Sequence, residues 1–249
     1  MDMSGRVAVI TGAGRDIGRA CAIRLAQAGA SVAINYHSSS TGADSAVAEI
    51  EAAGGKAFAQ QGDMTDPAAV EKLVAATVDR FGSLDTLIHV AGGLVARKPL
   101  PELSVEHWQT VMDLNATSFL HLARAGLPHL QKKGGVIVPI ASQAGRDGGG
   151  PGAIAYAASK AAVMTMARGM AKELGPDIRV NSVCPGMIST GFHDTFTKDE
   201  VRKHVSSITP LKREGSSEEV ADLVCYLASD SASFMTGTNV DINGGLLFS

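Results

Sequence analysis

Hydrophobic and polar positions along the chain follow two alternating patterns. Short runs of apolar, mostly β-branched residues, such as Val7–Ile10, are typical of strands buried on both faces of a sheet. Longer segments carry apolar residues at helical spacing, and the first of them, Ile17–Ala28, is followed by Gly29, a residue type that commonly ends helices. A second strand is expected at Ser31–Tyr36, so the chain opens with a strand, a helix and another strand.

The same alternation continues to the end of the chain, with no linker, repeat or change of composition. Further strands are expected at Ala57–Gln61, Leu87–Val90, Val136–Ala141, Arg179–Cys184 and Asn239–Ile242, and further helices at Ala43–Ala53, Ala68–Phe81, Val105–Leu130, Ala153–Leu174 and Glu218–Leu227. The pattern predicts an α/β fold in which residues 1–249 form a single domain. We expect a doubly wound parallel sheet of about seven strands with helices on both faces.

The composition excludes several classes of protein. Lys and Arg number 22 against 25 Asp and Glu, giving a net charge of −3, and no basic stripe is present, so a nucleic-acid partner is not expected. No apolar run is long enough to span a bilayer, and no secretory signal pattern is present. Cys21, Cys184 and Cys225 lack the spacing of a metal site or a disulfide framework. We expect a cytoplasmic protein with no metal and no membrane partner.

A glycine-rich segment follows the first strand, at the sheet edge where doubly wound folds bind ligands. Gly12, Gly14 and Gly18 enclose Arg15, Asp16 and Ile17 and lead directly into the first helix. Glycines at this place allow backbone N–H groups and a helix N-terminus to approach a pyrophosphate. The spacing is looser than the strict dinucleotide fingerprint, and a plain structural turn is the alternative interpretation.

The end of the second strand indicates which cofactor the chain prefers. An acid at this place would bind the ribose hydroxyl of NAD, but here the residues are Tyr36, His37 and Ser38, and the first acid downstream is Asp44. Arg15 could supply a guanidinium to a 2′-phosphate, with Ser38 and His37 as further donors. We therefore expect NADP(H) rather than NAD(H), which remains possible; solvated loop residues are the structural alternative.

A tyrosine and a lysine four residues apart form the first candidate for catalysis. Tyr156 and Lys160 lie on one face of an expected helix, so the ammonium can stand beside the phenol and favour its ionised form. A phenol so tuned can act as a general acid or base. Ser142 ends a strand on the ligand side of the sheet and can hydrogen-bond a substrate carbonyl. A surface helix pair and an ordinary strand-end serine are the structural alternatives.

Together these motifs resemble the short-chain dehydrogenase/reductase family over essentially the whole chain. The matching positions are Thr11–Gly18, Asp63, Ala91–Gly92, Asn115, Ser142, Tyr156, Lys160, Asn181, Pro185–Gly186, Thr190 and Asn243–Gly245. The resemblance implies a Rossmann fold and hydride transfer between a nicotinamide and a carbonyl or secondary alcohol. Similarity is nearest to 3-oxoacyl-acyl-carrier-protein reductases and to sugar, polyol or sugar-acid dehydrogenases.

The resemblance also implies roles for individual residues. Tyr156 would be the acid/base that serves the carbonyl oxygen, and Ser142 would polarise and orient that carbonyl. Lys160 would lower the pKa of Tyr156 and bind the nicotinamide ribose, and Asn115 would position a water in the proton relay. The cofactor would contact Gly12, Gly14, Arg15, Asp16, Ile17, Gly18, Tyr36, His37, Ser38, Asp63, Met64, Ala91, Gly92, Tyr156, Lys160, Pro185, Gly186, Ile188 and Thr190.

Two departures from the family pattern stand out. Asp16 occupies a position where the family usually has glycine, and its carboxylate would repel a pyrophosphate unless it caps the helix or pairs with Arg15 or Arg19. His89 and Val90 replace two asparagines of the turn that precedes Ala91–Gly92. We interpret His89 as a packed strand-end residue and not as a catalyst.

The substrate is expected to bind under a segment after Pro185–Gly186. The resemblance implies that residues 187–213, which carry Met187, Phe192, His193 and Phe196, set the specificity, and their mixed, weakly periodic composition is typical of a mobile lid. Arg97, Lys98 and Arg146 follow ligand-side strands and could favour an anionic substrate, although we favour simple surface solvation. The glycine run 148–152 would make the adjoining wall pliable.

Two other functions and one assembly are considered beside the predicted oxidoreductase. A non-catalytic, nucleotide-sensing Rossmann protein is the main alternative, but it needs no complete proton relay; a methyltransferase would have no use for the Tyr156–Lys160 pair. A homotetramer is expected from the family, with the apolar end Gly244–Phe248 as a possible subunit contact.

Overall fold

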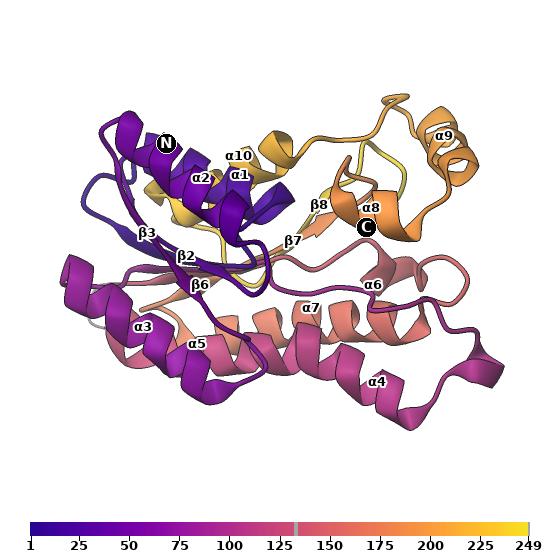
Figure 1. Ribbon diagram of the computed structural model, residues 1–249, viewed down its shortest axis with the longest axis horizontal. Coiled ribbons are helices and arrows are strands. Elements are labelled where there is room, and N and C mark those ends of the chain that lie inside the picture. The colour runs from indigo at the N-terminus through magenta and orange to yellow at the C-terminus, as the bar shows by residue number, and fades with distance from the viewer. Residues whose placement is uncertain (132–133, 249) are drawn as a thin grey trace.

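The fold is built on parallel strands covered by helices on both faces (Figure 1). A computed structural model describes residues 1–131 and 134–248 of the chain. The strands are β1 (Val7–Thr11), β2 (Ser31–Tyr36), β3 (Lys56–Gln61), β4 (Thr86–His89), β5 (Val136–Pro139), β6 (Arg179–Val180), β7 (Ser182–Pro185) and β8 (Asn239–Ile242). The α-helices are α1 (Asp16–Gln27), α2 (Ser40–Ala52), α3 (Pro67–Phe81), α4 (Val105–Met112), α5 (Ser118–Leu130), α6 (Ala144–Asp147), α7 (Ile154–Leu174), α8 (Gly191–Phe196), α9 (Asp199–Ile208) and α10 (Ser217–Ala228). Short helical turns are η1 (Leu100–Glu102), η2 (Asp113–Thr117) and η3 (Asp230–Ala232).

Six strands form a parallel sheet in the order β3-β2-β1-β4-β5-β6, and β7 pairs in parallel with β8. A parallel bridge between Ile140 and Val183 joins the edge of β5 to β7, so the second pair continues the sheet. The chain reverses its direction of strand addition between β1 and β4, which is the switch point where such folds bind ligands. The predicted doubly wound α/β fold is confirmed.

Alternate residues of the strands supply two hydrophobic cores, one on each face of the sheet. On one face Ile10 packs with Leu25 of α1 and Val224 of α10. On the other face Val9 packs with Phe119 of α5. Figure 1 shows the corresponding layers, with α1, α2 and α10 above the sheet and α3, α5 and α7 below it. These cores fix the carboxyl ends of β1, β4 and β5 side by side.

The predicted strand Arg179–Cys184 is divided into β6 and β7 at Asn181. The Asn181 side chain donates to the Met235 carbonyl at 2.8 Å and accepts from the backbone N–H and hydroxyl of Thr238 at 3.1 and 2.9 Å. These bonds tie the break to the loop before β8 and allow β7 to leave the edge of β6. Both β6 and β7 lie beside β5, so they occupy one position in the sheet. The eight strands of the described residues therefore fill seven positions, as expected from the sequence.

The predicted long helix Val105–Leu130 is also divided, by the π-helical turn η2. Asn115, in this turn, donates through Nδ2 to the carbonyl of Val111 at 2.9 Å, which interrupts the regular backbone ladder between α4 and α5. Apolar spacing continues through a π turn, so periodicity alone could not reveal it. Turns of this kind are frequent at functional sites.

The segment 187–213, expected from its weakly periodic composition to be a mobile lid, contains α8 and α9. Both helices stand beyond the carboxyl ends of the strands (Figure 1). Among the helices of the described residues, none is long and apolar enough to cross a membrane.

Candidate active site

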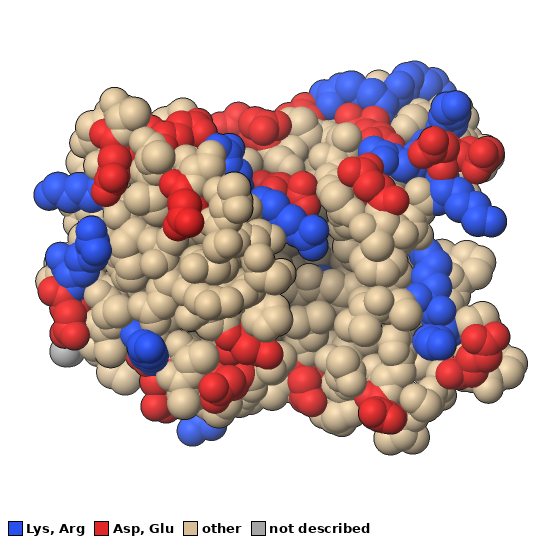
Figure 2. Space-filling view, viewed as in Figure 1, with Lys and Arg blue, Asp and Glu red and all other residues tan. Residues whose placement is uncertain are grey.

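A cavity of about 460 Å³ opens at the carboxyl ends of β1, β4, β5 and β7. Its floor includes Gly12 and Ser142, and its roof includes Phe192 of α8 and Val201 of α9. Figure 2 shows the hollow near the centre of one face, with charged side chains on its upper rim and uncharged atoms below. Because the loops that form it follow neighbouring strands, residues distant in sequence meet here.

The glycine-rich turn is built by close backbone approaches. A Cβ at Gly12 would lie 2.8 Å from the backbone nitrogen of Ala91, and one at Gly18 would lie 2.3 Å from the carbonyl oxygen of Gly12. A Cβ at Gly14 would lie 2.6 Å from the carbonyl oxygen of Ser39. The glycines therefore serve packing between the turn, β4 and α2. Gly12 and Gly18 also line the cavity, whereas Gly14 does not.

The structure explains why a glycine is usual at position 16. Asp16 has a φ of +49°, in the left-handed region that glycine adopts most easily and that Asp and Asn tolerate better than other residues. Its carboxylate accepts from the backbone N–H of Gly191, the first residue of α8, at 3.2 Å. Arg15 Nε lies 3.7 Å from the second carboxylate oxygen. Asp16 thus pairs with Arg15, one of the two predicted partners, and links the turn to segment 187–213.

The residues expected to contact a cofactor fall into two groups. Those that line the cavity are Gly12, Arg15, Asp16, Ile17, Gly18, Gly92, Tyr156, Lys160, Pro185, Gly186, Ile188 and Thr190. Those outside its lining are Gly14, Tyr36, His37, Ser38, Asp63, Met64 and Ala91. Most of the second group follow β2 and β3, on the side of the turn away from Tyr156. Asp63 accepts from the backbone N–H and hydroxyl of Thr65, both at 2.8 Å, which lowers the pKa of its carboxyl group.

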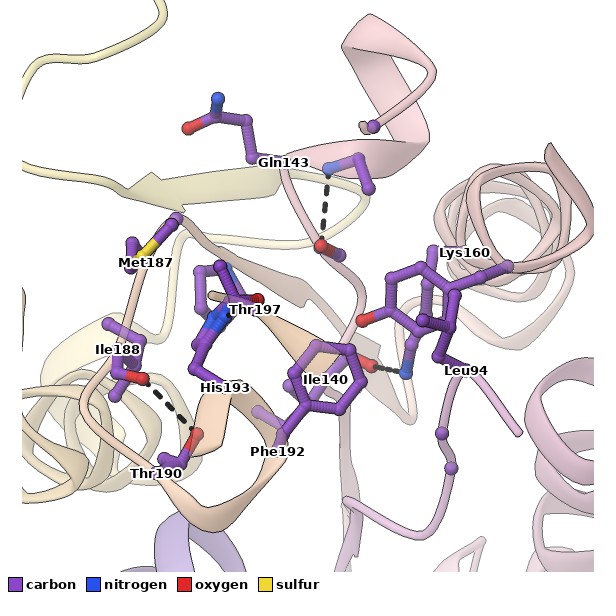
Figure 3. A pocket seen from close by; sticks show the side chains of 18 of the residues that line it. Leu94, Ile140, Gln143, Lys160, Met187, Ile188, Thr190, Phe192, His193 and Thr197 are labelled. Carbon is purple, nitrogen blue, oxygen red and sulfur yellow. Dashed lines mark hydrogen bonds between the residues drawn. The ribbon is translucent and has the colours of Figure 1, made fainter. Parts of the chain in front are cut away.

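Lys160 and Asn115 meet beside Gly92. Lys160 is 4% exposed, and its Nζ donates to the Ile140 carbonyl at 2.8 Å (Figure 3). A Cβ at Gly92 would lie 2.5 Å from Asn115 Oδ1 and 3.2 Å from Lys160 Nζ, so only glycine fits between them. Asn115 itself accepts from the N–H of Gly93 at 3.0 Å and donates to its carbonyl at 2.9 Å. The π turn therefore fixes the loop after β4 against the lysine.

Tyr156 lies one helical turn before Lys160 on α7, and Lys160 Nζ is 5.8 Å from the centre of the phenol ring. Burial raises the pKa of Tyr156 above its usual value of 10, and a hydrogen bond with Ser142 opposes that rise. The net direction is therefore opposite to the predicted lowering, because burial is the largest cause. Burial lowers the pKa of Lys160 to about 8. The phenol is held protonated at neutral pH, the state required of a proton donor.

His89 lies buried in a chain of hydrogen bonds behind the site. Thr11 Oγ1 accepts from the backbone N–H groups of the two residues after His89, each at 3.1 Å, and lies 3.1 Å from His89 Nδ1. On its other side, Nε2 lies 3.3 Å from Ser118 Oγ, which donates to the Leu114 carbonyl at 2.7 Å. These partners assign the proton to Nε2, and burial lowers the pKa of His89 to about 3. The expected packed, non-catalytic role agrees with this geometry.

Two arginines considered for anion binding have hydrogen-bond partners in the protein, and Arg97 is exposed as well, as expected from surface solvation. Arg97 donates from Nε to the Phe196 carbonyl and from Nη1 to the Pro151 carbonyl, both at 2.9 Å. Arg146 donates from Nε to Asp241 at 2.9 Å and to the carbonyl of Asn239 at 2.8 Å. Arg97 thereby joins α8 to the glycine run 148–152, and Arg146 joins α6 to β8.

Phe192, from the segment expected to set substrate specificity, packs on Tyr156 with ring centres 5.7 Å apart. Several other lining residues were not predicted as site residues. Gln143 follows Ser142; its Oε1 is a buried acceptor without a donor among the described residues. Leu94 and Leu246 line the cavity from the loop after β4 and from the C-terminal segment. Adjacency to Ser142 could have indicated Gln143, but no sequence signal marks the two leucines.

The residues present fit a nicotinamide dinucleotide. The first turn of α1 borders the cavity, and helix N-termini attract anionic groups such as a pyrophosphate. The buried Lys160 ammonium has three N–H donors and one hydrogen bond among the described residues, which leaves donors for ribose hydroxyls. The Asp16 carboxylate opposes an anion at the same place, but its bond to Gly191 and its proximity to Arg15 partly neutralise it.

Comparison with known proteins agrees with this geometry. A family model described as enoyl-(acyl carrier protein) reductase matches residues 12–247. A 3-oxoacyl-[acyl-carrier-protein] reductase of Synechocystis is 38% identical over 98% of both chains. A short-chain dehydrogenase of Burkholderia cenocepacia J2315, solved in complex with NADP, has a TM-score of 0.92 and 34% identity, covering 99% of both chains.

A solved 7α-hydroxysteroid dehydrogenase is similar to the same extent. It was determined in complex with NADH and 7-oxo glycochenodeoxycholic acid and has a TM-score of 0.93 and 34% identity, covering 98% of this chain and 95% of that one. The family match spans more than half of the chain, and the fold, the Tyr156–Lys160 pair and the glycine-rich turn agree with it. The chain therefore belongs to the short-chain dehydrogenase/reductase family of NAD(P)-dependent oxidoreductases.

Proposed function

We propose that the protein reduces a ketone with NADPH, with Tyr156 as the proton donor and the reverse oxidation as the minor direction. The observation that carries this proposal is the convergence of Tyr156, Ser142 and Lys160 on one cavity beside the glycine-rich turn. A nicotinamide bound there supplies the hydride. A non-catalytic nucleotide sensor needs no such convergence, which is why we prefer an enzyme.

Each of these residues has a distinct task in the proposed mechanism. Ser142 donates a hydrogen bond to the substrate carbonyl and orients it toward Tyr156. Tyr156 then gives its phenolic proton to the oxygen as negative charge develops there. Lys160, still an ammonium below about pH 8, stabilises the phenolate left behind. Asn115 holds the loop at Gly93 and, we propose, a water that returns a proton to the pair.

The cofactor would extend from Lys160 across the N-terminus of α1. We propose that Gly12, Ile17, Gly18, Gly92, Pro185, Gly186, Ile188 and Thr190 line its nicotinamide and pyrophosphate part. Gly14, Tyr36, His37, Ser38, Asp63, Met64 and Ala91 would border its adenosine part. Segment 187–213 would be the lid over the substrate, hinged at Pro185–Gly186.

Preference for NADP(H) rests on the end of β2, which has no acidic side chain, and on Arg15 in the adjacent turn. The Arg15 side chain is 69% exposed, so it is free to turn toward a 2′-phosphate. A relative solved with NADP and another with NADH both support a nicotinamide cofactor. Titration with NADPH and NADH, in the wild type and in Arg15→Ala, tests the preference. We expect the wild type to bind NADPH more tightly than NADH, and Arg15→Ala to lose this preference. Wild-type binding of NADH that equals or exceeds that of NADPH would contradict the proposed preference.

The decisive variant for the catalytic proposal is Tyr156→Phe. We expect it to bind NADPH as the wild type does, because the ring and its packing on Phe192 remain. Its turnover with a ketone should fall about 10²- to 10⁴-fold, the usual contribution of a general acid. Unchanged turnover would refute the assigned role, and absence of turnover in the wild type on a broad ketone and alcohol panel would favour the nucleotide sensor.

We also propose a cytoplasmic homotetramer. In the structure Leu246 lines the cavity, so the C-terminal segment forms part of the site in addition to any subunit contact. Light scattering of the whole chain and of a chain ending at Gly245 tests the assembly; identical masses would count against the C-terminal contact. Cell fractionation tests the location.

A further inference from the structure

Part of the cavity lining is apolar. We call this part the substrate end and define it by six apolar side chains that come from outside the glycine-rich turn: Leu94, Ala153, Phe192, Val201, Val205 and Leu246. These residues come from the loop after β4, from the start of α7, from α8 and α9, and from the C-terminal segment. Hydrophobic side chains from so many separate elements indicate a surface that binds by excluding water.

Two polar side chains of the lining, Asp147 and His193, have hydrogen-bond partners within the protein. Asp147 accepts from Gln143 Nε2 at 2.9 Å and from the backbone N–H of Gly149 at 2.8 Å, so both of its oxygens are used. His193 Nδ1 lies 2.9 Å from Thr197 Oγ1, and burial lowers its pKa, which keeps the ring neutral. Gln143 Oε1, a buried acceptor without a donor among the described residues, offers a substrate one hydrogen bond. Further hydroxyl or charged groups would compete with the bonds of Asp147 and His193 or lose hydration.

Arg97 is the cation nearest to this end, and it too has partners. Its Nε and Nη1 hold the carbonyl groups of Phe196 and Pro151, which come from α8 and from the glycine run. A Cβ at Gly152 would lie 3.0 Å from Arg97 Cβ, so this side chain is packed along its stem as well. Arg97 therefore braces the two walls of the cavity through Nε and Nη1, although its side chain is exposed and lines the cavity.

Aromatic rings cap the phenol that donates the proton. Phe192 packs 5.7 Å from Tyr156, and Phe196 packs 5.1 Å from Phe192 on its other side. In the view of Figure 3 the Phe192 ring lies between the His193 side chain and the Lys160 ammonium. A ketone whose carbonyl reaches Tyr156 must therefore pass its neighbouring carbons along the Phe192 ring. Rings and apolar chains gain from such contact, whereas hydroxyl groups and charges do not.

We propose that the substrate is an uncharged ketone flanked by an apolar ring or alicyclic group, and that Phe192 determines this selectivity. The proposal rests on the proposed ketone reduction and names its substrate class. It separates the site from those that bind sugars, sugar acids or other carboxylates. A ring stacked beside Phe192 would replace water over an otherwise exposed apolar wall.

The test compares matched ketones that differ in one substituent. Cyclohexanones that carry a phenyl, a hydroxyl or a carboxylate group opposite the carbonyl, and an acetoacetyl thioester, are assayed with NADPH by the nicotinamide absorbance. We expect the phenyl ketone to have a kcat/KM at least about tenfold above each of the others, mainly through KM, since a few buried carbons give discrimination of this size. Equal or better use of the hydroxyl, carboxylate or thioester substrate would overturn the proposal while leaving ketone reduction intact.

Variants at Phe192 test the assigned determinant. Phe192→Ala should lower the selectivity for phenyl over hydroxyl ketone about three- to tenfold, as loss of an aromatic contact does, and Phe192→Leu should lower it less. Phe234→Ala, at a fully exposed phenylalanine outside the cavity lining, is the matched control and should keep wild-type selectivity. Unchanged selectivity in a folded, NADPH-binding Phe192→Ala protein would refute the role of Phe192. Turnover of none of the four ketones would instead count against the proposed function itself.

Discussion

The two ends of the cavity are held by different kinds of interaction. At the cofactor end, Lys160 and His89 are 4% and 0% exposed, and their partners are mostly groups of the buried strands and of η2. At the lid end, Arg202 of α9 holds Asp194 of α8 and Glu214, and the side chain of Asp194 is 67% exposed. The exposed pair with Asp194 contributes about 0–1 kcal/mol, whereas the two-bond pair with Glu214 is largely shielded, with side-chain exposures of 18% and 17%. The cofactor end is thus held by buried hydrogen bonds, and the lid by ion pairs that lie nearer the surface.

The largest expected effect follows from removing the buried ammonium at the cofactor end. Lys160→Met should lower turnover about 10²- to 10⁴-fold. In the wild type, the depressed pKa of about 8 means that the ammonium persists below that pH and is lost above it, so ketone reduction should decline as pH rises through about 8. Steady-state rates across pH check both points.

Lys172→Met is the control for this prediction, since Lys172 is exposed on the same helix. It should leave both the rate and the pH profile unchanged. A wild-type reduction rate that increases between pH 8 and 10 would contradict the role given to Lys160.

A matched pair of glycine substitutions compares the packing of the two ends. Gly12 has a φ of +62° and no room for a Cβ, whereas a Cβ at Gly191 would meet its nearest atom, Asp16 Oδ2, at an ordinary 3.4 Å. Gly12→Ala should cost about 2–4 kcal/mol of unfolding free energy, from left-handed strain and overpacking. Gly191→Ala should stay within about 0.5 kcal/mol. Urea unfolding measures the unfolding free energy of both variants. Equal losses in Gly12→Ala and Gly191→Ala would contradict the tighter packing of the cofactor end.

The buried histidine predicts how the cofactor end responds to acid. Because the folded pKa of His89 is about 3 and its ordinary value is 6.5, the unfolded chain binds the extra proton first, and stability is lost as pH falls from 6.5 toward 3. Each unit of such a shift corresponds to about 1.4 kcal/mol.

His89→Asn isolates this effect. At pH 7 we expect it to be about 1–3 kcal/mol less stable than the wild type, since hydrogen bonds to Thr11 and Ser118 are weakened. The difference should shrink toward pH 4, because the variant has no buried imidazole to protonate. His204→Asn, at an exposed position of α9, is the control. A difference that stays constant with pH would argue that His89 does not titrate as described.

The smallest expected effect concerns Asp16, which connects the two ends. Asp16→Asn keeps a hydrogen-bond acceptor for Gly191 and tolerates the left-handed backbone, but it removes a negative charge beside the N-terminus of α1. NADPH should bind about two- to fivefold more tightly, the usual size of a charge effect at a helix end. Fluorescence titration measures this, with Asp44→Asn on α2 as the control; weaker binding would mean that Asp16 aids the cofactor.

Asp16→Gly separates the hydrogen bond from the charge. It removes both, so the unliganded protein should also be cleaved faster within residues 187–213 during limited proteolysis. Cleavage equal to that of Asp16→Asn would show that the bond to Gly191 does not hold the lid.

The cofactor end was easier to predict from sequence than the lid end, for a physical reason. Buried parallel strands require continuous apolar runs, and the turn after β1 requires glycines, so both leave local patterns. The sequence did not predict the π turn at Asn115 or the break between β6 and β7 at Asn181, because each depends on side-chain hydrogen bonds. Neither feature changes the local apolar pattern enough to be recognised in the sequence.

Contacts between residues distant in sequence define the structural roles of Arg97, Arg146 and Phe192, which the sequence did not settle. Arg97 and Arg146 are ordinary loop arginines in sequence and acquire their structural roles only through Phe196, Pro151 and Asp241. The stacking of Phe192 on Tyr156 joins residues from two helices that no periodicity connects. Burial, which sequence patterns do not quantify, reversed the predicted direction of the Tyr156 pKa.

The most direct test of the account follows the hydride itself. NADPH carrying deuterium on one or the other face of the transferring nicotinamide carbon is used to reduce the phenyl-substituted cyclohexanone, and the alcohol is analysed by mass spectrometry. The account predicts that one of the two cofactors delivers a single deuterium to the carbinol carbon, and that Tyr156→Phe binds this cofactor but forms almost no labelled alcohol. Alcohol without deuterium from either cofactor, or labelled alcohol formed equally fast by Tyr156→Phe, would contradict it.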